Sequence, residues 1–166
     1  MLDLLLKHCQ LPDGRKNVDI GVQGGRIVAI QTALQAQAHE VFDCAGQLVT
    51  SPFVDAHFHM DSTLTYGQPR INQSGTLLEG IALWGELKPT LAQDAIVARA
   101  LSYCDWAVAR GLLAIRSHVD ISDDRLLAVE ALLQVKQTVA PYLDLQLVAF
   151  PQDGALRSPT ALQNLQ

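Results

Sequence analysis

From residue 51 onward, apolar strand patterns alternate with helical patterns, and this alternation limits the folds available to the chain. The three expected strands lie within VTSPFVDAHF (49–58), LLAIRSHV (112–119) and LDLQLVAF (143–150). Helical patterns separate them, which gives the order βαβαβ. Each expected strand is apolar on both faces, as in a parallel sheet that helices cover. The sequence therefore predicts an α/β fold.

Both expected helices carry start and stop signals. The helix before the second strand begins near Thr90, which has with Gln93 the spacing of a capping box. In the helix before the third strand, Ser122 can serve as the cap and Pro141 ends the pattern. We therefore expect two well-defined helices between the strands.

A segment of about thirty residues, MDSTLTYGQPRINQSGTLLEGIALWGELKP, lies between the first strand and the first clear helix. It is much longer than the usual βα loop, and insertions of this length are commonly functional. Its second half, TLLEGIALWGEL, is expected to form a short helix. We expect the remainder to be a loop that arches over the end of the sheet.

Residues 1–50 form a different region, built from short strand patterns and turns. The expected strands are LDLLLKHCQL, NVDIGVQGG, RIVAIQ and HEVFDCAGQLVT, with turns at Pro12-Asp13-Gly14 and Gly24-Gly25. The predicted organisation is thus a small β region over residues 1–50 and an α/β region over residues 51–166.

Composition and charge exclude several classes of partner. The net charge is −5, the isoelectric point is near 5.4, and no run of Lys and Arg offers a surface for nucleic acid or anionic lipid. No apolar stretch approaches the roughly 20 residues of a membrane helix. The cysteines, Cys9, Cys44 and Cys104, are too widely spaced for a CxxC metal knuckle or a disulfide framework. A cytoplasmic protein that binds a small molecule fits these observations.

The clearest chemical signal is the pair His57 and His59 in SPFVDAHFHMDS. Side chains at i and i+2 of a strand lie on one face, so both imidazoles can reach one ion, whereas Phe58 points the other way. Neutral imidazole suits Zn, Fe, Cu or Ni. Two exposed histidines that end a strand by chance are the alternative. Asp55 shares this face, where it can orient a histidine or be a plain structural residue.

The second and third strands also end in polar residues. The second ends in RSHVD (116–120) and the third runs into FPQD (150–153), so the three carboxyl ends should meet at one rim. His118 can contribute to the metal site or the pocket, or be a structural histidine satisfied by Asp120 or a backbone carbonyl. Asp120 can likewise contribute to the pocket or simply lead into the Ser122 cap. Gln152 can bind a ligand or be a solvated loop residue.

These residues resemble a known family. The stretch VDAHFHMD behind a small β region resembles the amidohydrolase superfamily, which comprises metal-dependent hydrolases on a (β/α)8, or TIM, barrel. HFHMDSTLTYGQPRINQSGTLLEGI, RSHVDISD and VAPYLDLQLVAFPQDG are similar to the cytosine deaminase branch of barrel type found in bacteria. The similarity runs from about residue 17 to residue 154. That branch also contains relatives that act on isocytosine-like rings and on alkylamino-triazines.

The resemblance implies a fold, a reaction and site residues. Residues 1–50 would belong to a composite small domain, an incomplete β-sandwich, and residues 51–166 would supply the first three β/α units of a TIM barrel. His57 and His59 would bind a catalytic divalent metal, Fe or Zn, and Gln152 would bind the pyrimidine-like substrate. The reaction would convert cytosine and water to uracil and ammonia. The other metal ligands and the proton-shuttling residues come from later strands in that family, so no catalytic residue is assigned here.

Three strands fall short of the roughly 250 residues that an eight-stranded barrel takes. We therefore expect the chain to be an N-terminal fragment that is inactive by itself and binds metal weakly; self-association of the full-length enzyme is left open. One alternative is a non-catalytic metal- or ligand-binding α/β module or subunit. Another is a parent enzyme that acts on an N-alkylated triazine or another cyclic amidine.

Overall fold

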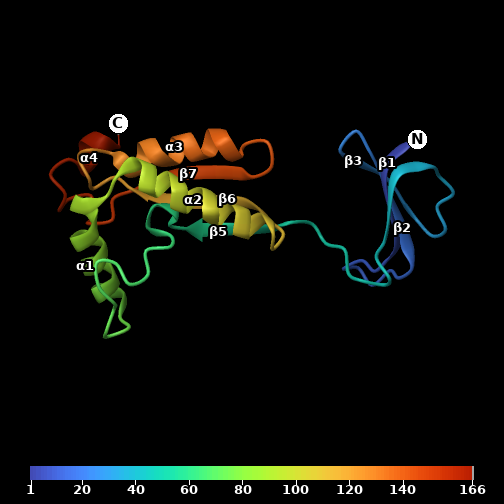
Figure 1. The fold of residues 1–166 in the computed structure, drawn as a ribbon, viewed down its shortest axis with the longest axis horizontal. Helices are drawn as coiled ribbons and strands as arrows, with labels where there is room; N and C mark the ends of the chain where they lie inside the picture. The colour runs from blue at the N-terminus through green and yellow to red at the C-terminus, as the bar shows by residue number, and fades with distance from the viewer. Residues whose placement is uncertain (166) are drawn as a thin grey trace. The chain divides into compact units, whose positions relative to one another are not determined.

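The computed structural model describes residues 1–165, which separate into two compact units, Met1–Ser51 and the chain from Pro52 onward. The first unit consists of strands and turns, and the second alternates strands with helices in the predicted order (Figure 1). Within the residues described, no helix combines the length and apolar character needed to cross a membrane.

The first unit is a four-stranded sheet with the order β3-β2-β1-β4. Its strands are β1 (Leu2–Cys9), β2 (Val18–Gln23), β3 (Arg26–Gln31) and β4 (Ala38–Asp43). The pairs β1–β2 and β2–β3 are antiparallel, whereas β1–β4 is parallel. The turn between β2 and β3 uses Gly24 and Gly25, both at positive φ, which a tight hairpin requires. All four strand patterns expected in residues 1–50 therefore form strands.

Two cysteines meet in the core of this unit. The Sγ atoms of Cys9 and Cys44 lie 3.5 Å apart, and both residues are buried free thiols. Their wide spacing along the sequence gave no hint of this contact, which the parallel pairing of β1 with β4 creates. Burial, followed by the hydrogen bond with Cys44, raises the pKa of Cys9 to about 12. Cys9 therefore packs as a protonated, largely apolar side chain.

The second unit is built on a parallel sheet with the order β5-β6-β7. Its elements are β5 (Phe53–Phe58), the 3-10 turn η1 (Met60–Ser62), α1 (Leu77–Leu87), the 3-10 turn η2 (Lys88–Thr90), α2 (Gln93–Val108), β6 (Leu112–Asp120), α3 (Leu127–Val139), β7 (Asp144–Phe150) and α4 (Ala161–Asn164). The short helix expected in the insertion is α1. Because the strands are parallel, the carboxyl ends of β5, β6 and β7 lie at one edge.

The helices α2 and α3 pack against the sheet and enclose the core (Figure 1). The buried residues include Ile96, Ala100, Cys104, Ile115, Val119, Ala131, Leu132, Val135, Val139 and Leu145. The sequence predicted strands covered on both faces, and this prediction is wrong for β5. On β5, Phe53 is 61% exposed and Val54 is 68% exposed, because β5 is an edge strand.

Two of the predicted helix caps are wrong. The N-cap of α2 is Ala92, and the Thr90 hydroxyl instead donates to the carbonyl of Leu87 within η2. Ser122 lies several residues before the start of α3, whose N-cap is Leu126. A side-chain cap occurs in the insertion, where the Thr76 hydroxyl accepts a hydrogen bond from the Glu79 amide of α1. Both predicted caps therefore have other hydrogen-bond partners: Thr90 bonds to Leu87, and Ser122 bonds to the Asp153 amide.

The exposed edge of β5 predicts self-association. Unpaired apolar edge strands pair readily with other chains, so we expect concentration-dependent oligomers of the 166-residue protein in size-exclusion chromatography with light scattering. Val54→Lys places a charge on this edge and should shift the protein toward monomer. Leu133→Lys, at an exposed position of α3, is the matched control and should not. A wild-type protein that stays monomeric and melts cooperatively at all concentrations would contradict this prediction.

Candidate functional site

A cavity of about 670 Å³ opens at the carboxyl ends of β5 and β7. The strand ends contribute His57, His59, Phe150 and Gln152 to its lining. The insertion contributes most of the remaining wall, including Asp61, Tyr66, Arg70, Asn72, Leu83, Trp84 and Leu87. The ends of β5 and β7 therefore meet under the insertion as predicted, whereas no residue of β6, including the candidates His118 and Asp120, is part of the lining.

His57 and His59 both face this cavity. Their ring centroids are 5.3 Å apart, and the ring planes meet at 62°. Phe58 points to the other side, where it stacks on Tyr103 of α2 at 4.3 Å, as the alternation of strand side chains predicts. Asp55 does not pair with an imidazole ring: its carboxylate accepts a hydrogen bond from the backbone amide of His57, at 3.1 Å. Asp55 thus orients the backbone at the end of β5.

His118 lies against the histidine pair. Its ring stacks on that of His57, with centroids 4.0 Å apart and an angle of 24° between planes. Its Nδ1 atom is buried and has no hydrogen-bond partner among the described residues, so the satisfied structural histidine, our simpler expectation, is wrong for this atom. The lone pairs of an imidazole lie in the ring plane. Two stacked rings therefore do not direct their nitrogens at a common point between them.

The surroundings of His59 favour its neutral imidazole. Burial, and then the positive charges that His57 and His118 can carry, lower the pKa of His59 below its usual value. Neutral imidazole is the form that binds metal ions.

The side chains present fit part of a metal site. Two neutral imidazoles at a rigid strand end suit a divalent ion such as Zn or Fe. Residues 1–165 contain no group of three or more His, Cys, Asp or Glu side chains arranged to hold a metal ion. The donor chemistry therefore fits, while the described residues supply two ligands of the three that a catalytic zinc usually takes from protein.

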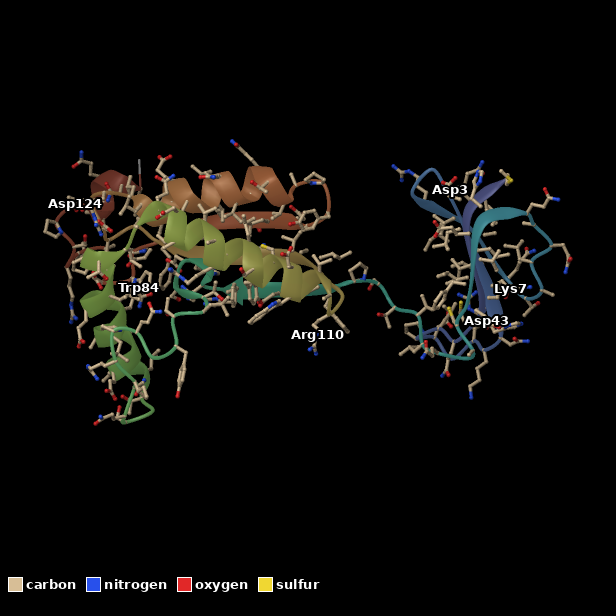
Figure 2. All side chains as sticks on the ribbon, viewed as in Figure 1. Asp3, Lys7, Asp43, Trp84, Arg110 and Asp124 are labelled. Atoms are coloured by element: carbon tan, nitrogen blue, oxygen red, sulfur yellow. The ribbon has the colours of Figure 1, made fainter. Side chains whose placement is uncertain are left out.

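Asp120 is not a lining residue of the cavity, but it anchors a residue that is. It is 3% exposed, and its carboxylate accepts hydrogen bonds from Trp84 Nε1 at 2.8 Å and from the Ser122 amide at 2.8 Å. Lys88 Nζ lies 2.9 Å from the same carboxylate. Trp84 projects from α1 toward the strand ends (Figure 2). Burial acts to raise the pKa of Asp120, but these donors outweigh it and hold the pKa below its usual value.

Asp61 makes the second buried link to the strand ends. It is 2% exposed, and its carboxylate accepts a hydrogen bond from the Asp120 amide at 2.8 Å. Burial raises the pKa of Asp61 to about 6. Arg99 of α2 donates to the carbonyls of Asp61 and Thr63, which fixes the turn after His59. The sequence analysis identified neither Asp61 nor Trp84. The position of Asp61, two residues after the candidate metal ligand His59, was a signal that could have identified it.

The outer part of the insertion is held by Arg70. Its guanidinium contacts Glu79 at 2.6 Å and Glu86 at 2.9 Å, both on α1. Hydrogen bonds from the hydroxyl and amide of Ser74, and then from Arg70, lower the pKa of Glu79 to about 2. This network ties the loop at residues 70–74 to the helix that forms the cavity wall.

Ser117 supports the turn that follows the histidine pair. Its buried hydroxyl accepts a hydrogen bond from the Met60 amide at 3.0 Å, which joins β6 to the residue after His59. Ser117→Ala should lower the free energy of unfolding in urea by about 1–3 kcal/mol, because a buried amide loses its acceptor. Ser102→Ala, on the exposed side of α2, should change it by less than about 0.5 kcal/mol. Equal effects of the two substitutions would show that the Ser117 contact is dispensable.

Solved structures share this fold. The 5-methylcytosine deaminase from Klebsiella pneumoniae, liganded with 5-fluorocytosine, superposes with a TM-score of 0.89 at 37% identity, over 96% of this chain and 39% of that one. The N-isopropylammelide isopropylaminohydrolase from Burkholderia multivorans ATCC 17616 gives a TM-score of 0.80 at 25% identity, over 99% of this chain and 42% of that one. The expected fold class, strands and helices of a TIM barrel behind a small β region, is confirmed.

Sequence comparison leads to the same group of proteins. The N-isopropylammelide isopropyl amidohydrolase of Pseudomonas sp. (strain ADP) is 32% identical over 157 residues, which cover 92% of this chain and 39% of the relative. The chain thus spans about two fifths of the length of these three relatives. Residues 40–166 match the model of the amidohydrolase family. The chain belongs to the amidohydrolase family.

Proposed function

We propose that this chain is part of a metal-dependent hydrolase that removes the exocyclic amino group of a cytosine-like ring. The observation that carries the proposal is the placement of the strand-end histidines and Gln152 around one cavity. The 37% identity to a structure titled 5-methylcytosine deaminase supports a pyrimidine as substrate. In the reaction, the oxygen of water replaces the amine on the ring carbon. One proton of that water leaves with ammonia and the other stays on the ring nitrogen.

His57 and His59 would hold the divalent ion. When bound, such an ion acidifies a water molecule so that it can attack the ring carbon near neutral pH. The protein contributes the rigidity of the site: the Asp55 carboxylate holds the backbone before the pair, and Ser117 and Arg99 hold the turn after it. Burial, and then the positive charges that His57 and His118 can carry, lower the pKa of His59 and so favour its neutral imidazole. Fe and Zn both suit this donor type.

Gln152 would bind the ring edge. A carboxamide offers one acceptor and two donors, which matches the alternating acceptor and donor groups of a cytosine-like ring. The ring of Phe150 meets that of His59 edge to face, with centroids 5.2 Å apart. Phe150 would therefore give the substrate ring an apolar contact next to the metal ligands. Leu83 and Trp84 line the cavity from α1 and add apolar surface to its wall. We assign no proton-transferring residue within the described part of the chain.

Hydrolysis of an N-alkylated aminotriazine is the second candidate. It is favoured by the 32% identity to the N-isopropylammelide hydrolase of Pseudomonas over 92% of this chain. Such a substrate has a triazine ring in place of the pyrimidine and carries an alkyl group on the departing amine, which needs additional apolar space beside the ring. The cavity wall formed by the insertion would have to provide that space.

A binding comparison tests the proposed function. The 166-residue protein is titrated with 5-fluorocytosine and with N-isopropylammelide in the presence of Zn²⁺, and Trp84 fluorescence is followed in a Trp106→Phe background. Tighter binding of 5-fluorocytosine supports a pyrimidine substrate, whereas tighter binding of N-isopropylammelide supports the triazine. Zn²⁺ binding without affinity for either ring would indicate a non-catalytic metal-binding module and would overturn the proposal.

Metal binding should depend on the histidine pair. We expect calorimetry to show weak Zn²⁺ binding by the wild-type protein, because the described residues supply only two ligands. Replacing His57 and His59 together by Ala should weaken this binding by more than about ten-fold, since losing ligands costs more than disturbing their support. His39→Ala, at an exposed position of β4, should have no effect. Unchanged affinity in the double variant would rule out the pair as ligands.

The same reasoning gives an expectation for activity. With two ligands and no assigned proton-transferring residue, the 166-residue protein should release no ammonia from cytosine at ordinary enzyme rates. An ammonia assay with added Zn²⁺ or Fe²⁺ measures this directly. Repeated turnover by the purified protein would contradict our account of the site.

A further inference from the structure

Lys88 joins three parts of the second unit through one ammonium group. It is the first residue of η2, directly after α1. Its Nζ atom lies 2.9 Å from the Asp120 carboxylate at the end of β6 and 2.7 Å from the Asp153 carboxylate after β7. The Lys88 side chain is only 12% exposed. The insertion is thus fastened to the ends of two strands at a shielded point.

This contact fixes the loop that carries Gln152. Asp153 follows Gln152 directly, and its backbone amide donates to the Ser122 hydroxyl at 3.1 Å. A turn from Pro151 to Gly154 is closed by a backbone hydrogen bond of 2.8 Å. Asp153 is therefore held through its side chain by Lys88 and through its backbone by Ser122. Gln152 lies between this anchored residue and the end of β7, so its backbone is held on both sides.

The Lys88 ammonium group is also linked, through Asp120, to the part of the cavity wall that Trp84 forms. Asp120 accepts hydrogen bonds from both Lys88 and Trp84, and Trp84 lines the cavity. Asp120 has further donors that satisfy it, whereas the only described hydrogen bond of the Asp153 side chain is the one from Lys88. Loss of the Lys88–Asp153 contact would therefore release the Gln152 loop, while the buried Asp120 carboxylate would keep its hydrogen bonds from Trp84 and Ser122.

We propose that Lys88 and Asp153 are positioning residues that hold Gln152 at the distance from the histidine pair that a bound ring requires. This inference rests on the proposed function, in which Gln152 binds the ring. Neither Lys88 nor Asp153 needs to touch the ligand. Their effect is to reduce the number of positions that the Gln152 loop can adopt, so that less freedom is lost when the ring binds.

Asp153→Asn tests the proposal with least risk to folding, because Asp153 is 44% exposed. Exchange at the amides of residues 153 and 154 should become faster, and affinity for 5-fluorocytosine with Zn²⁺ should fall about five-fold. The NMR signals of the Gln152 side-chain amide should shift while the melting temperature stays close to that of the wild type. Asp144→Asn, the same substitution at the other end of β7, is the matched control and should change none of these.

Lys88 variants complete the test. Lys88→Met should accelerate loop exchange as Asp153→Asn does, and Lys88→Arg, which keeps the charge and the donors, should restore slow exchange and affinity. If Asp153→Asn behaves like Asp144→Asn in exchange and in the Gln152 signals, the proposal is overturned. If the wild-type protein does not bind 5-fluorocytosine, the proposed function fails. The exchange and NMR comparison then still decides whether Lys88 and Asp153 fix the loop.

Discussion

The buried carboxylates Asp61 and Asp120 hold the inserted segment against the ends of the parallel strands. The insertion has little apolar core of its own, since Tyr66, Leu77 and Leu78 are largely exposed. Its inner end is instead attached through hydrogen bonds from the Asp120 amide to Asp61 and from the Trp84 indole to Asp120. Such contacts are stable only when each buried polar group has partners, and both carboxylates have several. Without them the cavity would lack the wall that α1 provides.

The strand ends and the orientation of the histidine pair follow from the sequence because they depend on local patterns. A two-residue period places His57 and His59 on one face and Phe58 on the other, and parallel pairing gathers the ends of β5 and β7. Gln152 could be predicted for the same reason, as the polar residue just past a strand end. Its role as a ligand-binding residue remains a proposal.

Contacts between distant residues were beyond local patterns. Thr90 and Ser122 both have the chemistry of helix caps. Thr90 instead donates to the nearby carbonyl of Leu87, whereas Ser122 accepts from the amide of Asp153, 31 residues further along the chain. Asp61, Trp84 and Lys88 interact with Asp120 across 59, 36 and 32 residues, distances along the chain at which no periodicity applies. The buried Nδ1 of His118, which has no hydrogen-bond partner among the described residues, is likewise a result of the tertiary structure that no local pattern predicts.

The histidine pair and the surrounding walls of the cavity are held in place by different kinds of contact. His57 is placed by strand β5, and His59, which follows the strand, is held by the contact of Ser117 with the Met60 amide. The inner end of the insertion and the Gln152 loop are held by charged and polar contacts around Lys88. Two imidazoles that bind a metal ion do not by themselves select between ring substrates with different substituents. Among the described residues, most of the remaining cavity lining belongs to the insertion and the Gln152 loop, so under the proposed function these segments are this chain's contribution to distinguishing a free amine from an alkylated one.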